Sequence, residues 1–312
     1  MMLKKPKFWD YKKISIISIL LLPFSGIYIF LFWTFKFYKS FKTYRKANIT
    51  TICVGNIYIG GTGKTSLSIE INNILSKKKY KTCFVKKFYK NQQDEQILLK
   101  NHGQLFLSNK RSSAIRDAED KGFEIAILDD GLQDQSIEYD TKIVCFNNLN
   151  WIGNGLTIPA GPLREEISNL KNYKQVFING NLENLEYLKK KILNINPGIN
   201  INIGKYIPEN LNEFNIEDNY LVFSGIGNHK TFVSMMKEYS FKILKDFEFP
   251  DHYQYKDNDI KKITNLAKEL GCKIVTTEKD FLRLKNMNFE NLKFIKSKLK
   301  ILEEEKFIKS II

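Results

Sequence analysis

From residue 49 onward, two hydrophobic patterns alternate along the chain. Short apolar runs of strand length are followed by stretches in which apolar residues recur every three or four positions, as on one face of a helix. The predicted strands are 49–54, 81–85, 124–128, 142–146 and 175–178. A helical pattern with Leu67, Ile71, Ile74 and Leu75 on one face follows the first strand, and further helices are predicted at 94–100, 111–121 and 183–193. This alternation predicts an α/β fold with a mostly parallel sheet flanked by helices.

A second, shorter set of elements follows a polar stretch at 208–219 that is typical of a linker. Strands are predicted at 220–223, 241–249 and 273–276, and helices at 228–239 and 256–270. We therefore expect three parts, namely an N-terminal segment at 1–46, a larger domain at 47–207 and a smaller α/β domain at 208–312.

Residues 14–35 form a segment of 22 residues without a charge, which is long enough to cross a bilayer. Basic residues lie on both sides of it. They are Lys4, Lys5, Lys7, Lys12 and Lys13 before the segment, and Lys36, Lys39, Lys42, Arg45 and Lys46 after it. A single span would export five lysines, against the positive-inside bias, and Pro23, Ser25 and Gly26 interrupt its middle. We expect a helix that dips into the cytoplasmic leaflet or a kinked re-entrant anchor, rather than a cleaved signal peptide or a buried core helix.

The net charge of +15 raises the question of a nucleic-acid partner. Only five of the 49 basic residues are arginine, and lysine, asparagine and isoleucine are abundant together, which indicates a coding bias. We expect no nucleic-acid partner, and we assign part of the charge to an anionic membrane or a phosphorylated substrate. The four cysteines are dispersed, so no zinc pattern is present and a reduced compartment with buried thiols is expected.

The most informative stretch is the glycine-rich loop at 55–65, between a predicted strand and a predicted helix. Glycines allow backbone N–H groups to converge on phosphate oxygens, and a helix N-terminus favours negative charge. Lys64 would reach the terminal phosphates and Thr65 would ligate Mg²⁺. The nucleotide-binding residues are predicted to be Tyr58, Ile59, Gly60, Gly61, Thr62, Gly63, Lys64 and Thr65. Tyr58 occupies a position where a phosphate loop usually has glycine, and the alternative is a glycine-rich hairpin.

Two acidic pairs are candidates for chemistry. Asp129 and Asp130 end an apolar strand, where an acidic residue of a nucleotide-binding sheet holds Mg²⁺ or its water. Asp94 and Glu95 open a predicted helix, where acidic residues are common because they complement the helix dipole. A kinase acting on a hydroxyl, however, needs a carboxylate near the acceptor oxygen.

Further candidates lie on loops. Arg164 follows the rigid sequence P-A-G-P-L and could clamp a phosphate, or simply belong to a surface turn. Residues 224–228, S-G-I-G-N, could form an anion site or a tight turn. His252 could transfer protons beside Asp251, although a lone histidine is more often structural. Residues 276–280, T-T-E-K-D, close a predicted strand and have the spacing of a capped helix start.

Taken together, these motifs resemble the tetraacyldisaccharide 4'-kinase family of lipid A biosynthesis. The matching motifs span nearly the whole chain in the family's order. They are G-N-I-Y-I-G-G-T-G-K-T at 55–65, D-E at 94–95, D-D-G-L-Q at 129–133, G-N-G at 153–155, P-A-G-P-L-R-E at 159–165, S-G-I-G-N at 224–228, F-P-D-H at 249–252 and T-T-E-K-D at 276–280. The N-terminal apolar segment is similar to the family's membrane-associated helix.

The resemblance implies a two-domain P-loop kinase that transfers the γ-phosphate of ATP, with Mg²⁺, to the 4'-hydroxyl of an acylated glucosamine disaccharide 1-phosphate, which yields lipid IV-A at the cytoplasmic face of the inner membrane. We expect the protein to be a monomer. Asp94 would be catalytic together with His252, and Lys64 would stabilise phosphate charge. The Mg²⁺ residues would be Thr65, Glu95, Asp129 and Asp130. The substrate-binding residues would be Tyr89, Lys110, Arg111, Gln133 and Arg164.

Three departures from the family's pattern affect the rate and the contacts with the substrate more than the type of reaction. The family's S-R-G-Y-G-R is K-K-F-Y-K-N at 86–91, where Tyr89 is retained and Lys87 is an approximate substitute for an arginine. Asp134 and Tyr253 stand where the family tends to have histidine. Two other hypotheses are a membrane-attached P-loop hydrolase or transport motor and a degenerate, weakly active relative. Dependence of ATP turnover on the lipid acceptor distinguishes a kinase from a hydrolase.

Overall fold

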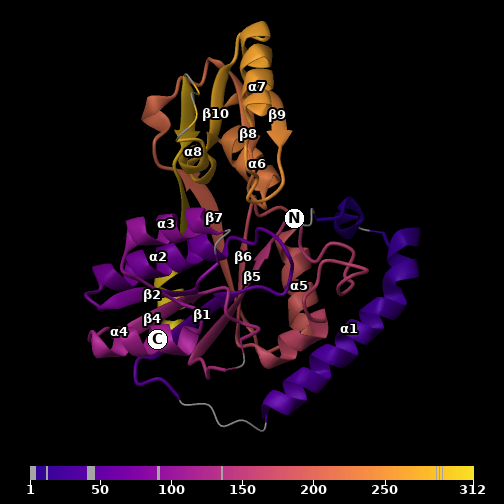
Figure 1. Ribbon diagram of the computed structural model, residues 1–312, viewed down its shortest axis with the longest axis vertical. Helices are drawn as coiled ribbons and strands as arrows, with labels where there is room; N and C mark the ends of the chain where they lie inside the picture. The colour runs from indigo at the N-terminus through magenta and orange to yellow at the C-terminus, as the bar shows by residue number, and fades with distance from the viewer. Residues whose placement is uncertain are drawn as a thin grey trace.

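The computed structural model describes residues 5–11, 13–40, 46–89, 92–134, 136–285, 287, 289 and 291–312. Six residues named above lie outside these ranges. They are Lys4, Lys12, Lys42, Arg45, Lys90 and Asn91. Two sheets follow one another along the long axis of the molecule, and a long helix lies beside the larger one (Figure 1).

The larger sheet has eight strands in the order β12-β7-β6-β5-β1-β4-β2-β3. They are β1 (Thr50–Gly55), β2 (Thr82–Lys87), β3 (Leu105–Ser108), β4 (Ile125–Asp129), β5 (Thr141–Asn147), β6 (Gln175–Asn179), β7 (Asn200–Pro208) and β12 (Ser297–Ile301). All neighbours pair in parallel, apart from β12 and β7, which are antiparallel. The carboxyl ends of the parallel strands therefore meet at one edge, where ligands of open α/β sheets bind.

Helices cover both faces of this sheet, as predicted. Apolar residues of α2 (Lys64–Lys77), α3 (Gln93–His102) and α9 (Glu304–Ile311) pack on one face, with Ile52 and Val54 of β1. On the other face, α4 (Arg111–Asp120) and α5 (Leu185–Ile195) pack with Cys53 of the same strand. The central strand is thus buried on both sides, which explains why its sequence is a continuous apolar run.

The smaller sheet is entirely parallel, with the strand order β11-β10-β8-β9. Its strands are β8 (Asn219–Ser224), β9 (Lys242–Glu248), β10 (Lys273–Thr277) and β11 (Leu292–Ile295). Helix α6 (His229–Glu238) packs on one face, and α7 (Asp257–Glu269) and α8 (Glu278–Leu284) pack on the other. The predicted α/β fold with a second, smaller α/β unit is confirmed.

The end of the chain returns to the larger sheet, which differs from the predicted grouping of residues 208–312. Strand β12 pairs with β7, and Phe307, Ile308 and Ile311 of α9 are buried in the core beneath α2. The hydrophobic pattern did not predict β3, β7, β11, β12 or α9. These strands are short or carry polar residues, glycine and proline, and a pattern of this kind contains no information about which sheet an edge strand joins.

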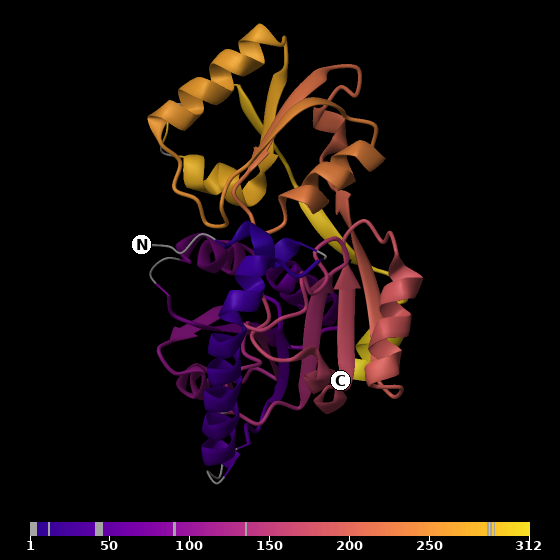
Figure 2. The same ribbon diagram turned by 90° about the vertical axis from the view of Figure 1, so that its right-hand side faces the viewer.

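Helix α1 (Ile16–Ser40) lies lengthwise along the larger-sheet part of the molecule (Figure 2). In the described part of the chain it is the one helix long and apolar enough to cross a membrane, and only 11% of its most apolar window is buried. One narrow polar face contacts the protein, where Ser25 Oγ donates to Thr157 O at 2.9 Å and Tyr28 OH donates to Arg164 O at 2.7 Å. Most of its apolar side chains are exposed, so α1 is not a buried core helix.

We predict that only one of the four thiols reacts in the folded protein. Cys53, Cys83 and Cys145 are buried, whereas Cys272 is partly exposed. Burial raises the pKa of Cys53 and of Cys83 to about 12, so neither forms the reactive thiolate at neutral pH. A chromogenic thiol reagent should react with one cysteine in the native protein and with all four in denaturant. Rapid native labelling that persists in Cys272→Ser would contradict this assignment.

Candidate active site

The glycine-rich loop joins β1 to α2 at the carboxyl edge of the larger sheet. It ends at Gly63, whose φ of 78° suits glycine, and Lys64 is the first residue of the helix. Side-chain amides hold the loop in place, because Asn56 Nδ2 donates to Thr62 Oγ1 at 3.0 Å and Asn179 Nδ2 donates to Thr62 O at 2.8 Å. The order strand, glycine loop, Gly-Lys-Thr and helix predicted from the sequence is therefore present.

Tyr58 does not point its side chain at the space above this loop. Its ring is fully buried, and its hydroxyl donates to Asp10 Oδ1 at 2.6 Å and accepts a hydrogen bond from Lys5. Asp10 ends a short 3-10 helix, Lys7–Asp10, that precedes α1. The Tyr58 side chain thus attaches the N-terminal segment to the loop. Only the backbone of this residue is left to contact a nucleotide.

The loop after β8 lies directly against the glycine-rich loop. A Cβ atom added to Gly61 would lie 2.6 Å from the carbonyl carbon of Gly227, and one added to Gly227 would lie 2.8 Å from Asp251 Oδ2. The hydroxyl of Ser224 pairs with Nδ1 of the buried His229 at 2.7 Å. The observed contacts of residues 224–228 are those of a tightly packed turn, and they place the smaller sheet beside the candidate nucleotide site.

The two carboxylates at the end of β4, Asp129 and Asp130, contact different partners. Asp130, with φ of 49°, accepts from Arg164 Nη1 at 2.8 Å and lies 4.0 Å from Lys64 Nζ. Burial opposes ionisation of Asp130, but Lys64 and Arg164 outweigh it and hold the pKa of this carboxyl well below its usual value. Gln133 joins the same group, because Arg164 Nη1 donates to its Oε1 at 3.1 Å.

Asp129 instead faces a buried lysine. Lys86 Nζ lies 2.5 Å from Asp129 Oδ2 and 2.8 Å from Glu95 Oε2, and Thr65 Oγ1 lies 3.5 Å from the same Asp129 oxygen. Burial would lower the pKa of Lys86, but the two carboxylates outweigh it and raise that pKa above its usual value. A positive charge is therefore held at the end of β2, between two of the residues predicted to organise Mg²⁺.

Asp94 and His252 are brought together across the junction of the two sheets. Asp94 is in the first turn of α3, and His252 follows β9 with a φ of 57°. Nδ1 of the imidazole lies 3.2 Å from both carboxylate oxygens of Asp94. Arg283 and Lys279 of α8 add positive charge, with Arg283 Nη2 at 2.5 Å and Lys279 Nζ at 3.5 Å from Asp94 Oδ2.

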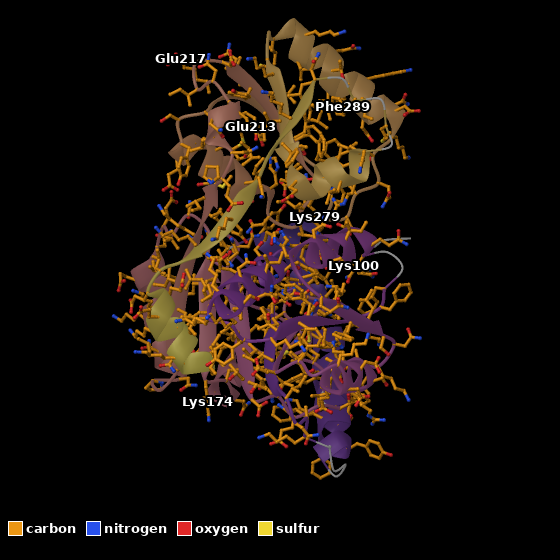
Figure 3. The ribbon with its side chains drawn as sticks, turned by 90° about the vertical axis from the view of Figure 1, so that its left-hand side faces the viewer. Lys100, Lys174, Glu213, Glu217, Lys279 and Phe289 are labelled. Atoms are coloured by element: carbon orange, nitrogen blue, oxygen red, sulfur yellow. The ribbon has the colours of Figure 1, made fainter. Side chains whose placement is uncertain are left out.

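These cations explain the ionisation of Asp94. Burial opposes the charged form, but the hydrogen bond from His252 and the charges of Lys279 and Arg283 hold the pKa of Asp94 well below its usual value. Lys279 also lies 3.0 Å from Glu95 Oε1, and it is labelled in Figure 3 at the junction between the smaller sheet and the helices of the larger one.

We predict that Arg283→Met destabilises the protein, because Arg283 connects three acceptors across this junction. Its Nη1 donates to Gly225 O at 2.6 Å and to Asp280 Oδ1 at 2.8 Å, and its Nη2 donates to Asp94. Removal would leave two buried carboxylates without this partner, which typically costs about 3 kcal/mol of unfolding free energy. Chemical denaturation measures the change. The control is Lys285→Met, on an exposed lysine just after the same helix. Equal denaturation midpoints for the two variants would contradict the prediction.

The remaining predicted substrate residues are more dispersed. Arg111, at the start of α4, donates to Asp130 O at 2.6 Å and to Asp134 Oδ2 at 3.0 Å, so Asp134 has become its ion-pair partner. Lys110 precedes it and is exposed. Tyr89 is also exposed, with Lys87 Nζ 5.7 Å from its ring centroid.

The oxygen-rich end of β4 fits a Mg²⁺ ion bound together with a nucleotide. Asp129 Oδ1 is buried without a hydrogen-bond partner, and the Thr65 hydroxyl lies beside the other oxygen of the same carboxylate. Within the described ranges, no three His, Cys, Asp or Glu residues are grouped closely enough to hold a metal by themselves. This arrangement is typical of Mg²⁺, which keeps water and phosphate oxygens as ligands and uses few protein carboxylates.

Sequence reasoning missed three basic residues of this site. Lys86 and Lys279 lie within the motifs at 86–91 and 276–280, which by themselves indicate no role for either lysine, and Arg283 lies in no motif. The scarcity of arginine in the chain is a usable signal for Arg283. The structure describes four of the five arginines, and three of them, Arg111, Arg164 and Arg283, contact the acidic pairs at 129–130 and 94–95.

Comparison with known proteins gives concordant matches. A family model described as tetraacyldisaccharide-1-P 4'-kinase matches residues 17–312. A tetraacyldisaccharide 4'-kinase of Pelagibacter ubique is 57% identical over 312 residues, which cover 100% of this chain and 98% of that protein. A protein of the same name from Rickettsia canadensis is 33% identical over 310 residues, which cover 91% and 89% of the two chains.

Among solved structures, the fold is similar to that of LpxK from Aquifex aeolicus, which was crystallised in complex with ATP. The TM-score is 0.68 at 24% sequence identity, and the match covers 94% of this chain and 98% of that one. This likeness extends over both sheets and confirms the predicted architecture of a phosphate-loop protein.

Proposed function

Because the chain belongs to the tetraacyldisaccharide 4'-kinase family, we propose that it transfers the γ-phosphate of ATP to the 4'-hydroxyl of a tetraacylated glucosamine disaccharide 1-phosphate. The product of this step in lipid A biosynthesis is lipid IV-A. The observation that carries the proposal is the pairing of Asp94 with His252 next to a phosphate loop. A hydrolase or transport motor would use the same loop and leave that pair without a role.

In the proposed reaction, the 4'-oxygen forms a bond to the γ-phosphorus as the bond between that phosphorus and the β,γ-bridging oxygen breaks. Backbone N–H groups of 60–65 hold the phosphates, and Lys64 stabilises the charge that develops on the transferred group. We assign Arg164 and Arg111, which both donate hydrogen bonds to Asp130, to the binding of a second anionic group of the substrate.

Asp94 is the carboxylate positioned to orient the 4'-hydroxyl or accept its proton. Its low pKa keeps it ionised at neutral pH, so it can act without first losing a proton. The imidazole of His252 contacts both of its oxygens and can carry the proton onward. We assign the two residues one shared role in handling the proton of the acceptor hydroxyl.

Mg²⁺ would be held by Thr65 and Asp129, with Glu95 and Asp130 nearby, and it would neutralise charge on the β- and γ-phosphates. The residues of this chain contribute the fixed carboxylates and the hydroxyl on which such an ion depends. The Asp129 oxygen without a hydrogen-bond partner is the feature that most favours this assignment.

We further propose that α1 lies in the cytoplasmic leaflet of the inner membrane and positions the site at the lipid surface. Its polar face is hydrogen-bonded to the loop that carries Arg164, and its other faces are apolar and exposed. A helix attached in this way along its length would bring the acyl chains of a lipid substrate close to the phosphate-binding residues.

The test is the dependence of ADP release on the acceptor. We expect ADP formation in detergent micelles to require tetraacyldisaccharide 1-phosphate and to stop when EDTA removes divalent ions. The matched control is the same lipid already phosphorylated at its 4'-position. ADP release at one rate with either lipid, or with none, would favour the hydrolase, and no release from a folded sample would favour the degenerate relative.

A further inference from the structure

The side chain of Lys86 enters the candidate metal site from β2 and is only 3% exposed. We infer that Lys86 is a built-in cation that neutralises Asp129 before the divalent ion arrives and competes with that ion for the carboxylate. This inference deepens the proposed function and rests on it for the identity of the site. It adds a residue that tunes metal affinity in this chain.

The contacts of Asp129 support a competition for one specific carboxylate. In the described part of the chain, Lys86 is the only basic residue paired with Asp129, and the Thr65 hydroxyl lies at 3.5 Å. Glu95 has a second cation, because Lys279 Nζ lies 3.0 Å from its other oxygen. Withdrawal of the ammonium group would therefore leave Glu95 partly neutralised but Asp129 without any cation.

The chemistry of lysine makes such an exchange feasible. Its ammonium group is a compact charge on a flexible four-carbon stem, so it can leave one carboxylate and stay with another. A divalent ion at Asp129 would repel the ammonium group, because like charges a few ångströms apart interact strongly in a poorly solvated site. Metal binding then includes the work of displacing Lys86, and the observed affinity of the nucleotide-free protein is weaker than that of the carboxylates alone.

The proposal is tested by metal binding without lipid or nucleotide. Mn²⁺ replaces Mg²⁺ as the probe, and electron paramagnetic resonance measures the free ion in a titration. We expect Lys86→Met to bind Mn²⁺ about tenfold more tightly than the unmodified protein. The control is Lys298→Met, which removes a lysine from another buried carboxylate, Glu70, at 3.3 Å, and should leave the affinity unchanged. Equal or weaker binding by Lys86→Met would overturn the inference.

A thermal readout gives a second, independent measure. Lys86→Met leaves the buried Asp129 without a cation and Glu95 with Lys279 alone, so its Tm should fall in EDTA and recover on addition of Mg²⁺. The unmodified protein should respond much less to the same addition. If the methionine variant does not fold, Lys86→Gln replaces it, because the amide can still donate to a carboxylate. A Tm that Mg²⁺ fails to raise in the folded variant would contradict the inference.

These measurements separate the inference from the proposed function. Tighter metal binding by Lys86→Met together with failure of phosphoryl transfer to the lipid would overturn the kinase assignment and leave the role of Lys86 standing. Normal lipid phosphorylation by the unmodified protein, together with unchanged metal affinity in Lys86→Met, would overturn the inference about Lys86 and leave the kinase assignment standing.

Discussion

Replacement of Asp94 by asparagine is expected to slow phosphoryl transfer to the lipid by about 10³-fold, which is the scale of a positioned general base. The amide keeps the shape of the carboxylate but cannot accept the hydroxyl proton. Because the pKa of Asp94 is held low, the loss should persist across neutral and moderately alkaline pH. The measurement is the initial rate of lipid phosphorylation at saturating ATP.

Two controls make this result specific. ATP affinity should stay within a few-fold of the unmodified protein, because Asp94 contacts His252, Lys279 and Arg283 rather than the glycine-rich loop. Asp117→Asn, on an exposed aspartate of α4, should leave the rate unchanged. A folded Asp94→Asn protein with full activity would remove the catalytic role of this carboxylate.

Lys64→Met is the second large effect that we predict, with transfer slowed by about 10²-fold to 10³-fold through the loss of charge stabilisation on the phosphates. Lys64 opens α2, and its ammonium group lies 4.0 Å from Asp130, so the side chain already projects toward the acidic strand end. Both kcat and ATP affinity should fall, and kinetics over a range of ATP concentrations measure each.

The control for this variant lies on the same helix. Lys77→Met changes an exposed lysine at the opposite end of α2 and should leave both constants near those of the unmodified protein. If Lys64→Met retained full activity, the loop at 55–65 could no longer be assigned as the phosphate cradle.

The sequence predicted the features that depend on local order. The apolar run of β1, the glycines after it and the amphipathic pattern of α2 are contiguous, so their arrangement follows from periodicity and turn chemistry. The membership of β12 in the larger sheet depends instead on which edge is free after the chain has crossed to the smaller sheet and returned.

The candidate site shows the same limit at the level of side chains. Asp94 and His252 are separated by 158 residues, and their proximity was implied by a family resemblance rather than by spacing. The pairing of Lys86 with Asp129 depends on the register between β2 and β4, which the hydrophobic pattern does not specify. Long-range charge complementarity of this kind becomes visible only in the folded chain.

The kinase assignment stands or falls on transfer of labelled γ-phosphate from ATP to tetraacyldisaccharide 1-phosphate in detergent micelles, with the position of the label on the product mapped by mass spectrometry. We expect Mg²⁺-dependent label on the 4'-oxygen of the lipid, lost in Asp94→Asn. Loss of ATP without labelled lipid, or label at any other position, would contradict it.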